Sequence, residues 1–215
     1  MLNTDILIVG SGVAGLMFAI KTAQKRRDLS ITILTKDGAD ATNTRYAQGG
    51  VAAVMNRLED SFEQHIQDTI QSGGGLCDEN IVKMVVQQAP ERLRELINLG
   101  VSFDTNQQGN WDLGLEGGHS QSRILHHKDL TGLEIERVLL HQAKKQPNII
   151  LFEHHSIIDL LIENNSKKRC IGAVYFDKKH QKIGQVHSRI TMLCSGGCGQ
   201  LFQHTTNPAI ATGDG

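Results

Sequence analysis

Glycines close to the N-terminus are spaced to hold a phosphate group. They form a Gly-x-Gly-x-x-Gly pattern made of Gly10, Ser11, Gly12, Val13, Ala14 and Gly15. An apolar run, Asp5–Val9, precedes the pattern, and Val13–Gln24 follows with helical spacing of its apolar residues. In that setting the glycines allow a tight turn, a close backbone approach to a pyrophosphate, and close packing of helix on strand. The N-terminus of the helix adds free N–H groups and a positive dipole end, so the pattern predicts a dinucleotide site.

The residues after the second predicted strand bear on which dinucleotide binds. That strand, Ser30–Thr35, ends without the acidic residue that commonly binds the ribose of NAD, since Thr35-Lys36 stands there and Asp37 comes slightly late. The simple NAD interpretation is therefore weakened. Lys36 could contact a phosphate or the adenosine half of the ligand, or it could be a solvated surface lysine.

A long polar stretch, Lys36–Gly50, separates this unit from the rest of the chain. It exceeds the usual length of a connection in an α/β unit, and such loops in compact domains are mostly functional or disordered. Small hydroxyl residues, an arginine and a Gly-Gly pair favour a functional loop. The candidate binding residues in it are Asn43, Thr44, Arg45, Tyr46, Ala47, Gln48, Gly49 and Gly50.

The elements that must position these residues follow from apolar periodicity. Further helices are predicted over Ser61–Ser72, Glu79–Leu99 and Thr131–Lys144. Asp78 is the expected N-cap of the second of these, and Gly100 its stop. From about 149 to 190 the pattern predicts an antiparallel β-meander, with turns at Asn164-Asn165 and Lys178-Lys179, and a last strand ends at Cys194. The predicted fold class is α/β, a doubly wound, Rossmann-like parallel sheet with this meander.

Composition excludes several classes of protein. The net charge is −1 and aromatic residues make up 4% of 215, so neither nucleic acid nor an anionic membrane is an expected partner. The four cysteines form no CxxC pair, which indicates free thiols in a reducing compartment and no metal site. No leader and no membrane-spanning run is evident, so a cytoplasmic protein is expected.

One segment resembles a known flavoprotein family. Asn43-Thr44-Arg45-Tyr46-Ala47-Gln48-Gly49-Gly50-Val51-Ala52-Ala53 is similar to the flavin-contacting segment of the fumarate reductase, succinate dehydrogenase and L-aspartate oxidase superfamily. Its Thr-x-Tyr-Ala-Gln-Gly-Gly form is that of the L-aspartate oxidases. Further matches, colinear along the chain, are Glu116–Ser120, Arg123–His126, Asp129, Thr131-Gly132, Thr205–Pro208 and Gly213–Gly215.

The resemblance implies FAD as the cofactor. Backbone N–H groups of Gln48-Gly49-Gly50 would lie near the isoalloxazine ring and stabilise its electron-rich reduced form. It places Asn43 and Thr44 at the pyrophosphate–ribityl region and Asp214 at the flavin moiety. Ser195-Gly196 and the backbone near Ile157 would contact the adenosine part. In the membrane-bound relatives a histidine at the position of Asn43 links the flavin covalently, so FAD is expected to be non-covalent here.

Glu116 suggests the substrate. Fumarate and succinate enzymes carry an apolar residue before this Gly-Gly pair, whereas L-aspartate oxidases carry Glu. A carboxylate would repel succinate and could pair with the ammonium of L-aspartate, worth about 1–3 kcal/mol of discrimination. The resemblance thus implies oxidation of L-aspartate to iminoaspartate, with oxygen or fumarate as electron acceptor, in the quinolinate route of NAD biosynthesis.

The resemblance also bears on domain organisation. It implies that residues 1–215 are an N-terminal FAD-binding domain, ending before a capping domain with the catalytic arginine and before a helical C-terminal region. The chain alone is therefore expected to be inactive. Three interpretations stay open: the N-terminal part of an L-aspartate oxidase, a soluble relative of fumarate reductase or succinate dehydrogenase, and a non-catalytic FAD-binding module.

Overall fold

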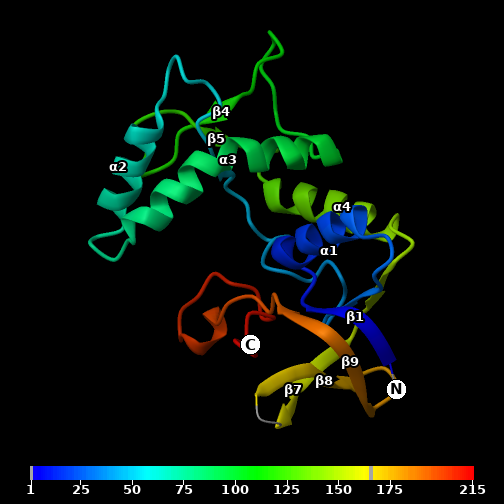
Figure 1. Ribbon diagram of the computed structural model, residues 1–215. Helices are drawn as coiled ribbons and strands as arrows, with labels where there is room; N and C mark the ends of the chain where they lie inside the picture. The colour runs from blue at the N-terminus through cyan, green and yellow to red at the C-terminus, as the bar shows by residue number, and fades with distance from the viewer. Residues whose placement is uncertain (1, 165–166) are drawn as a thin grey trace. The chain divides into compact units, whose positions relative to one another are not determined.

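The computed structural model describes residues 2–164 and 167–215, which form two compact units (Figure 1). The first unit comprises Met1–Tyr46 and Ile135–Gly215, and the second unit is Ala47–Glu134. The predicted turn at Asn164-Asn165 reaches outside the described residues. Each unit has its own elements and is considered by itself.

The first unit is built on one six-stranded sheet with the order β6-β2-β1-β9-β8-β7. Strands β6, β2 and β1 and the second half of β9 run parallel, while β9, β8 and β7 form an antiparallel meander. This mixed sheet confirms the predicted α/β class. The strands are β1 (Leu2–Val9), β2 (Ile31–Leu34), β6 (Ile149–Phe152), β7 (His155–Asn164), β8 (Lys168–Asp177) and β9 (Lys182–Leu193).

Two strands differ from the sequence-based expectation. Ile149–Phe152, expected at the start of the meander, pairs in parallel with β2, because the helix before it returns the chain to the same edge of the sheet. The last two expected strands are one strand, β9. Its first half pairs with β8 and its second half, from Val186 on, pairs with β1. A single strand therefore joins the meander to the parallel sheet.

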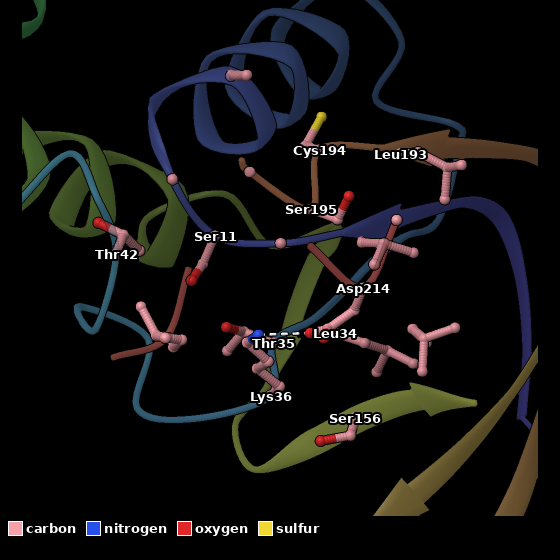
Figure 2. Close-up of a pocket in the computed structure, with 18 of the residues that line it drawn as sticks. Ser11, Leu34, Thr35, Lys36, Thr42, Ser156, Leu193, Cys194, Ser195 and Asp214 are labelled. Carbon is pink, nitrogen blue, oxygen red and sulfur yellow. Dashed lines mark hydrogen bonds and ion pairs between the residues drawn. The ribbon is translucent and has the colours of Figure 1, made fainter. Parts of the chain in front are cut away.

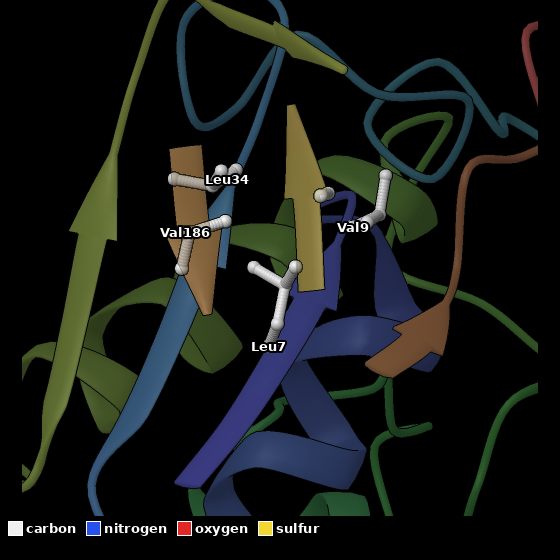
Figure 3. Close-up of a cluster of buried hydrophobic side chains, with 5 residues drawn as sticks. Leu7, Val9, Leu34 and Val186 are labelled. Carbon is white, nitrogen blue, oxygen red and sulfur yellow. The ribbon is translucent and has the colours of Figure 1, made fainter. Parts of the chain in front are cut away.

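Helices and apolar side chains bury the centre of this sheet. Helix α1 (Val13–Lys25) turns Leu16, Ala19 and Ile20 inward, at the spacing expected of an amphipathic helix. Helix α4 (Thr131–Lys144) belongs to this unit from Ile135 on. A further cluster packs around the strands (Figure 3); its members are Leu7, Val9, Leu34, Ala173 and Val186. Each large apolar side chain fully buried there stabilises the fold by about 1.5–3 kcal/mol.

The second unit consists of two helices and a small sheet. Helices α2 (Phe62–Ser72) and α3 (Glu79–Leu99) pack on each other, and the sheet has the order β3-β5-β4. Asp78 caps α3 through the N–H groups of its first turn, and Gly100 ends it in the left-handed conformation, both as predicted. The short strands are β3 (Val51–Ala52), β4 (Leu113–Gly114) and β5 (Ile124–Leu125).

The helices of the described residues give no candidate for a membrane span, because none combines sufficient length with sufficient hydropathy.

Candidate functional site

A cavity of about 540 Å³ opens in the first unit where several strands end (Figure 2). It lies at the carboxyl ends of β1, β2 and β9 and beside the start of β7, the edge of a parallel sheet where ligands bind. Its volume is within the range of pockets that hold small molecules, about 300–1,000 Å³. The predicted site residues that line it are Gly10, Ser11, Gly12, Val13, Ala14, Lys36, Asn43, Thr44, Ser195, Gly196 and Asp214.

The glycine loop has the geometry that its sequence predicts. Gly10 has φ +103°, a conformation that side chains rarely adopt, and a Cβ there would overlap the carbonyl of Cys194. A Cβ on Gly15 would overlap the Gly10 carbonyl, so Gly15 lies outside the cavity and lets α1 pack on the loop. At Gly12 a Cβ would come within 3.3 Å of the Thr44 hydroxyl. The loop thus passes close to its neighbours at all three glycines.

The N-terminus of α1 faces the cavity as an anion-binding end. Its first turn holds no acidic residue, and the Val13 N–H donates to the Thr44 hydroxyl at 3.0 Å. Within the described chain the N–H groups of Ser11, Gly12 and Ala14 have no acceptor. The Ser11 side chain, 1% exposed, instead donates to the Ala39 carbonyl at 2.7 Å. Free N–H groups at a positive helix end are suited to a phosphate.

Lys36 and Asp214 meet at this cavity although 178 residues separate them. The Lys36 ammonium pairs with the Asp214 carboxylate and also contacts the Thr212 hydroxyl, which itself donates to Asp214 at 2.6 Å. Figure 2 shows both residues on the same wall. Hydrogen bonds from Lys36 and from Thr212 lower the pKa of Asp214. Lys36 is therefore a cavity residue with a partner, which favours a role at the cavity over a solvated surface lysine.

Some predicted residues lie elsewhere, and some cavity residues were not predicted. Arg45 pairs with Asp40, and the Tyr46 side chain is 57% exposed. Ala47, Gln48, Gly49, Gly50 and Glu116 belong to the second unit. His155 lines the cavity, and its N–H donates to the Thr35 carbonyl at 2.8 Å, which holds it beside the end of β2. This position follows from the parallel pairing of β6, the strand just before His155, with β2, a pairing that the sequence pattern did not predict.

In the second unit the Ala47–Gly50 segment lies against Glu116. A Glu116 carboxylate oxygen comes within 3.6 Å of where a Cβ on Gly49 would stand. Gly50 packs on β5 so closely that a Cβ would overlap Ile124 and the Leu125 carbonyl. The structure therefore brings together two predicted features, the Gly-Gly turn and Glu116, that are more than sixty residues apart.

A buried ion-pair network holds the loop that carries Glu116. Arg123 donates to both carboxylate oxygens of Asp60, each at 2.8 Å, and to Asp68 at 2.6 Å. The backbone N–H and hydroxyl of Ser120 also donate to Asp68, at 2.9 and 2.7 Å. Burial would raise the pKa of Asp68, but the hydrogen bonds from Ser120 and Arg123 outweigh it and hold that pKa well below its usual range. The loop is thereby tied to α2.

The same network sets the tautomer of His119. Arg123 Nη1 lies 3.1 Å from His119 Nδ1. Because a guanidinium can only donate, Nδ1 accepts this hydrogen bond, and a neutral imidazole carries its proton on Nε2. The neighbouring His65 is buried, and burial followed by the charge of Arg123 lowers its pKa. The lowered pKa favours a neutral His65 imidazole beside the Glu116 loop.

Comparisons with known proteins agree on one family. A family model described as "FAD binding domain" matches residues 5–215. The chain is 46% identical over 212 residues to "L-aspartate oxidase, chloroplastic" of Arabidopsis thaliana, covering 98% of this chain and 32% of that protein. It is 38% identical to "L-aspartate oxidase" of Yersinia pestis, covering 99% of this chain and 40% of that protein. The chain thus spans about a third to two fifths of the length of these curated relatives.

A solved structure gives a similar result. Quinol fumarate reductase of E. coli superposes with a TM-score of 0.90 at 29% identity, covering 98% of this chain and 36% of that one.

Proposed function

The chain belongs to the FAD binding domain family, and from this premise we propose that it is the cofactor-binding part of an L-aspartate oxidase. FAD is the cofactor of this family. The fit to this chain is supported by the glycine loop and by the free N–H groups at the start of α1, which suit a pyrophosphate. Gly10, Gly12 and Thr44 would hold that part of the cofactor, and Lys36 and Asp214 stand on the same cavity wall.

FAD would be bound without a covalent link. Asn43 lines the cavity. By the resemblance described above, it stands at the position where the membrane-bound relatives carry the histidine that links the flavin. An amide nitrogen cannot act as the nucleophile that this bond needs. When bound, FAD supplies the acceptor for the hydride removed from the substrate, and oxygen or fumarate then takes the electrons.

The observation that supports L-aspartate as the substrate is the position of Glu116 against Gly49. We assign the Gln48–Gly50 amides to the flavin by resemblance, so this carboxylate would lie close to the substrate. A carboxylate pairs well with an ammonium and repels a dicarboxylate without one. The Asp68–Arg123–Ser120 network supports this role because it restrains the loop that carries Glu116. The product would be iminoaspartate, which leads to quinolinate and NAD.

Substrate turnover would require more than this chain. The acid–base and carboxylate-clamping groups implied by the resemblance belong to the remaining length of the relatives. The cytoplasmic location is still a prediction, and the printed name of the plant relative places that protein in the chloroplast.

Glu116→Gln tests the proposal in a polypeptide that spans the relatives' full length. Replacing a charge-assisted hydrogen bond by a neutral one should lower kcat/KM for L-aspartate by about ten- to hundredfold, mainly through KM. Fumarate reduction, measured on the same flavin-normalised sample, should be unchanged or improved, because a negative charge facing a dianion is removed.

Glu59→Gln is the matched control, since Glu59 is an exposed acid of the same unit. It should leave both activities unchanged. Equal losses of the two activities in Glu116→Gln, or no loss, would mean that Glu116 does not distinguish aspartate from succinate. A protein that reduces fumarate but never oxidises L-aspartate would instead support the fumarate reductase interpretation.

A further inference from the structure

The first turn of α4 holds the Ala47–Gly50 segment by two of its carbonyl groups. The Gly132 N–H donates to the Ala47 carbonyl at 2.8 Å, and the Thr131 hydroxyl donates to the Gly49 carbonyl at 3.3 Å. Thr131 is only 2% exposed, so its hydroxyl is largely shielded from water. All of these residues belong to the second unit.

A hydrogen bond from His127 determines which way the proton of the Thr131 hydroxyl points. The backbone N–H of His127 donates to Thr131 Oγ1 at 3.0 Å. A hydroxyl has one proton and accepts through its lone pairs. Because the His127 N–H donates to a lone pair of the Thr131 oxygen, the hydroxyl proton of Thr131 is free to donate to the Gly49 carbonyl.

The hydrogen bonds to the Ala47 and Gly49 carbonyls determine where two N–H groups of the segment point. A peptide unit is planar and trans, so its C=O and N–H point in opposite directions. The Ala47 carbonyl shares a peptide unit with the Gln48 N–H, and the Gly49 carbonyl shares one with the Gly50 N–H. With both carbonyls turned toward the start of α4, both N–H groups point away from it. Neither N–H donates to any residue that the structure describes.

Packing resists a flip of the second of these peptide units. Gly50 lies directly against β5, where a Cβ would overlap Ile124 and the Leu125 carbonyl. The Glu116 carboxylate lies near Gly49. The Gly49–Gly50 peptide is therefore packed against β5 at Gly50, and the Thr131 hydroxyl is the side-chain group bonded to it.

We propose that Thr131 is a positioning residue for the flavin. Its hydroxyl orients the Gly49–Gly50 peptide so that the N–H groups of Gly50 and Gln48 form a pair of donors for the electron-rich edge of the isoalloxazine ring. This inference rests on the proposed function, which assigns that segment to the flavin. Preoriented N–H donors favour the reduced, more negative ring over the oxidised ring. Thr131 therefore raises the reduction potential of bound FAD without touching it.

Thr131→Val tests this role, because valine keeps the shape of threonine and removes the hydroxyl. The weakened donor should lower the ratio of reduced to oxidised FAD at a given potential by about three- to tenfold, the effect of one hydrogen bond. For a two-electron couple this is a drop of about 15–30 mV, measured by equilibration with a redox dye. Thr131→Ser keeps the hydroxyl and should restore the potential.

Thr69→Val is the matched control. It removes a threonine hydroxyl from the same unit, one that donates to the His65 carbonyl within α2 and not to a carbonyl of the Ala47–Gly50 segment. Its potential should stay at the wild-type value. If Thr69→Val lowers the potential as much as Thr131→Val, the effect is general loosening and the proposal is wrong.

Amide NMR of the ¹⁵N-labelled chain, titrated with FAD, provides a readout that needs no variant. The Gln48 and Gly50 amide protons should shift on binding, and the Gly49 amide proton, which belongs to the intervening peptide, should shift less. Equal shifts of all three amides, or an unchanged potential in Thr131→Val, would overturn the proposal. Both readouts require bound FAD only, so they are valid whether or not L-aspartate is the substrate.

Discussion

Replacing Arg123 by Met should destabilise the second unit strongly. The Arg123 side chain is 1% exposed, and its carboxylate partners Asp60 and Asp68 are 5% and 9% exposed. Removing the cation leaves two buried carboxylates without their counter-charge. Breaking a buried ion pair in this way costs about 3–5 kcal/mol. Because Gln64 and Ser120, which also bond Asp68, are exposed, the cluster lies just under the surface and we expect the lower end, about 3 kcal/mol.

The assay uses the only tryptophan of the chain, Trp111, which lies in the second unit. Its ring meets that of Phe103 edge-on, with centroids 6.4 Å apart, so its fluorescence should report unfolding of this unit. With a urea slope of about 1–3 kcal/mol/M, the midpoint should fall by about 1–3 M. Arg123→Lys keeps the charge but loses the planar fork that serves both carboxylates, so its midpoint should fall between those of wild type and Arg123→Met.

The pH dependence has a definite sign. The pKa of Asp68 is depressed in the folded state, so its contribution to stability is full above the unfolded pKa of about 3.9 and is lost as the pH falls further. The difference between wild type and Arg123→Met should therefore shrink below about pH 4.

A second substitution can refute this explanation. Adding Asp60→Asn to Arg123→Met removes one of the two buried carboxylates that lack a counter-charge, and it should recover part of the lost stability. If the double variant is less stable than Arg123→Met, or if Arg123→Met costs under about 1 kcal/mol, the network does not stabilise the unit as described.

Three further outcomes are expected. Acid precipitation of the FAD-loaded protein should leave all yellow colour in the supernatant, because Asn43 cannot form a covalent link; flavin in the pellet would contradict this. The 215-residue chain loaded with FAD should make no sustained hydrogen peroxide from L-aspartate, since productive chemistry needs positioned acid–base groups, and sustained peroxide would show that it carries them. Burial raises the pKa of Glu136 to about 7, so the wild type should lose stability as the pH rises from about 4.5 to 7. In circular dichroism melting, Glu136→Gln should therefore gain more in Tm over wild type at pH 8 than at pH 5. An equal gain at both pH values would show that Glu136 is not protonated in the folded state.

The sequence by itself determined the features that depend on local chemistry. The glycine loop, the helix between Val13 and Lys25, the cap at Asp78 and the stop at Gly100 follow from residues close in the chain, because caps, turns and periodicity act over a few residues. The superfamily could be identified from short colinear motifs for the same reason. These features do not depend on which strands are neighbours.

Only the tertiary structure decided which distant groups meet. The apolar pattern of Ile149–Phe152 suits a parallel and an antiparallel strand alike, and its partner β2 is selected by the path of α4, the helix before it. The pairs Lys36–Asp214 and Arg123–Asp60, and the bond of Thr131 to Gly49, join residues 178, 63 and 82 positions apart. A charge or hydroxyl in a sequence carries no mark of its partner, because the partner is set by the packing of whole elements that bury the apolar core.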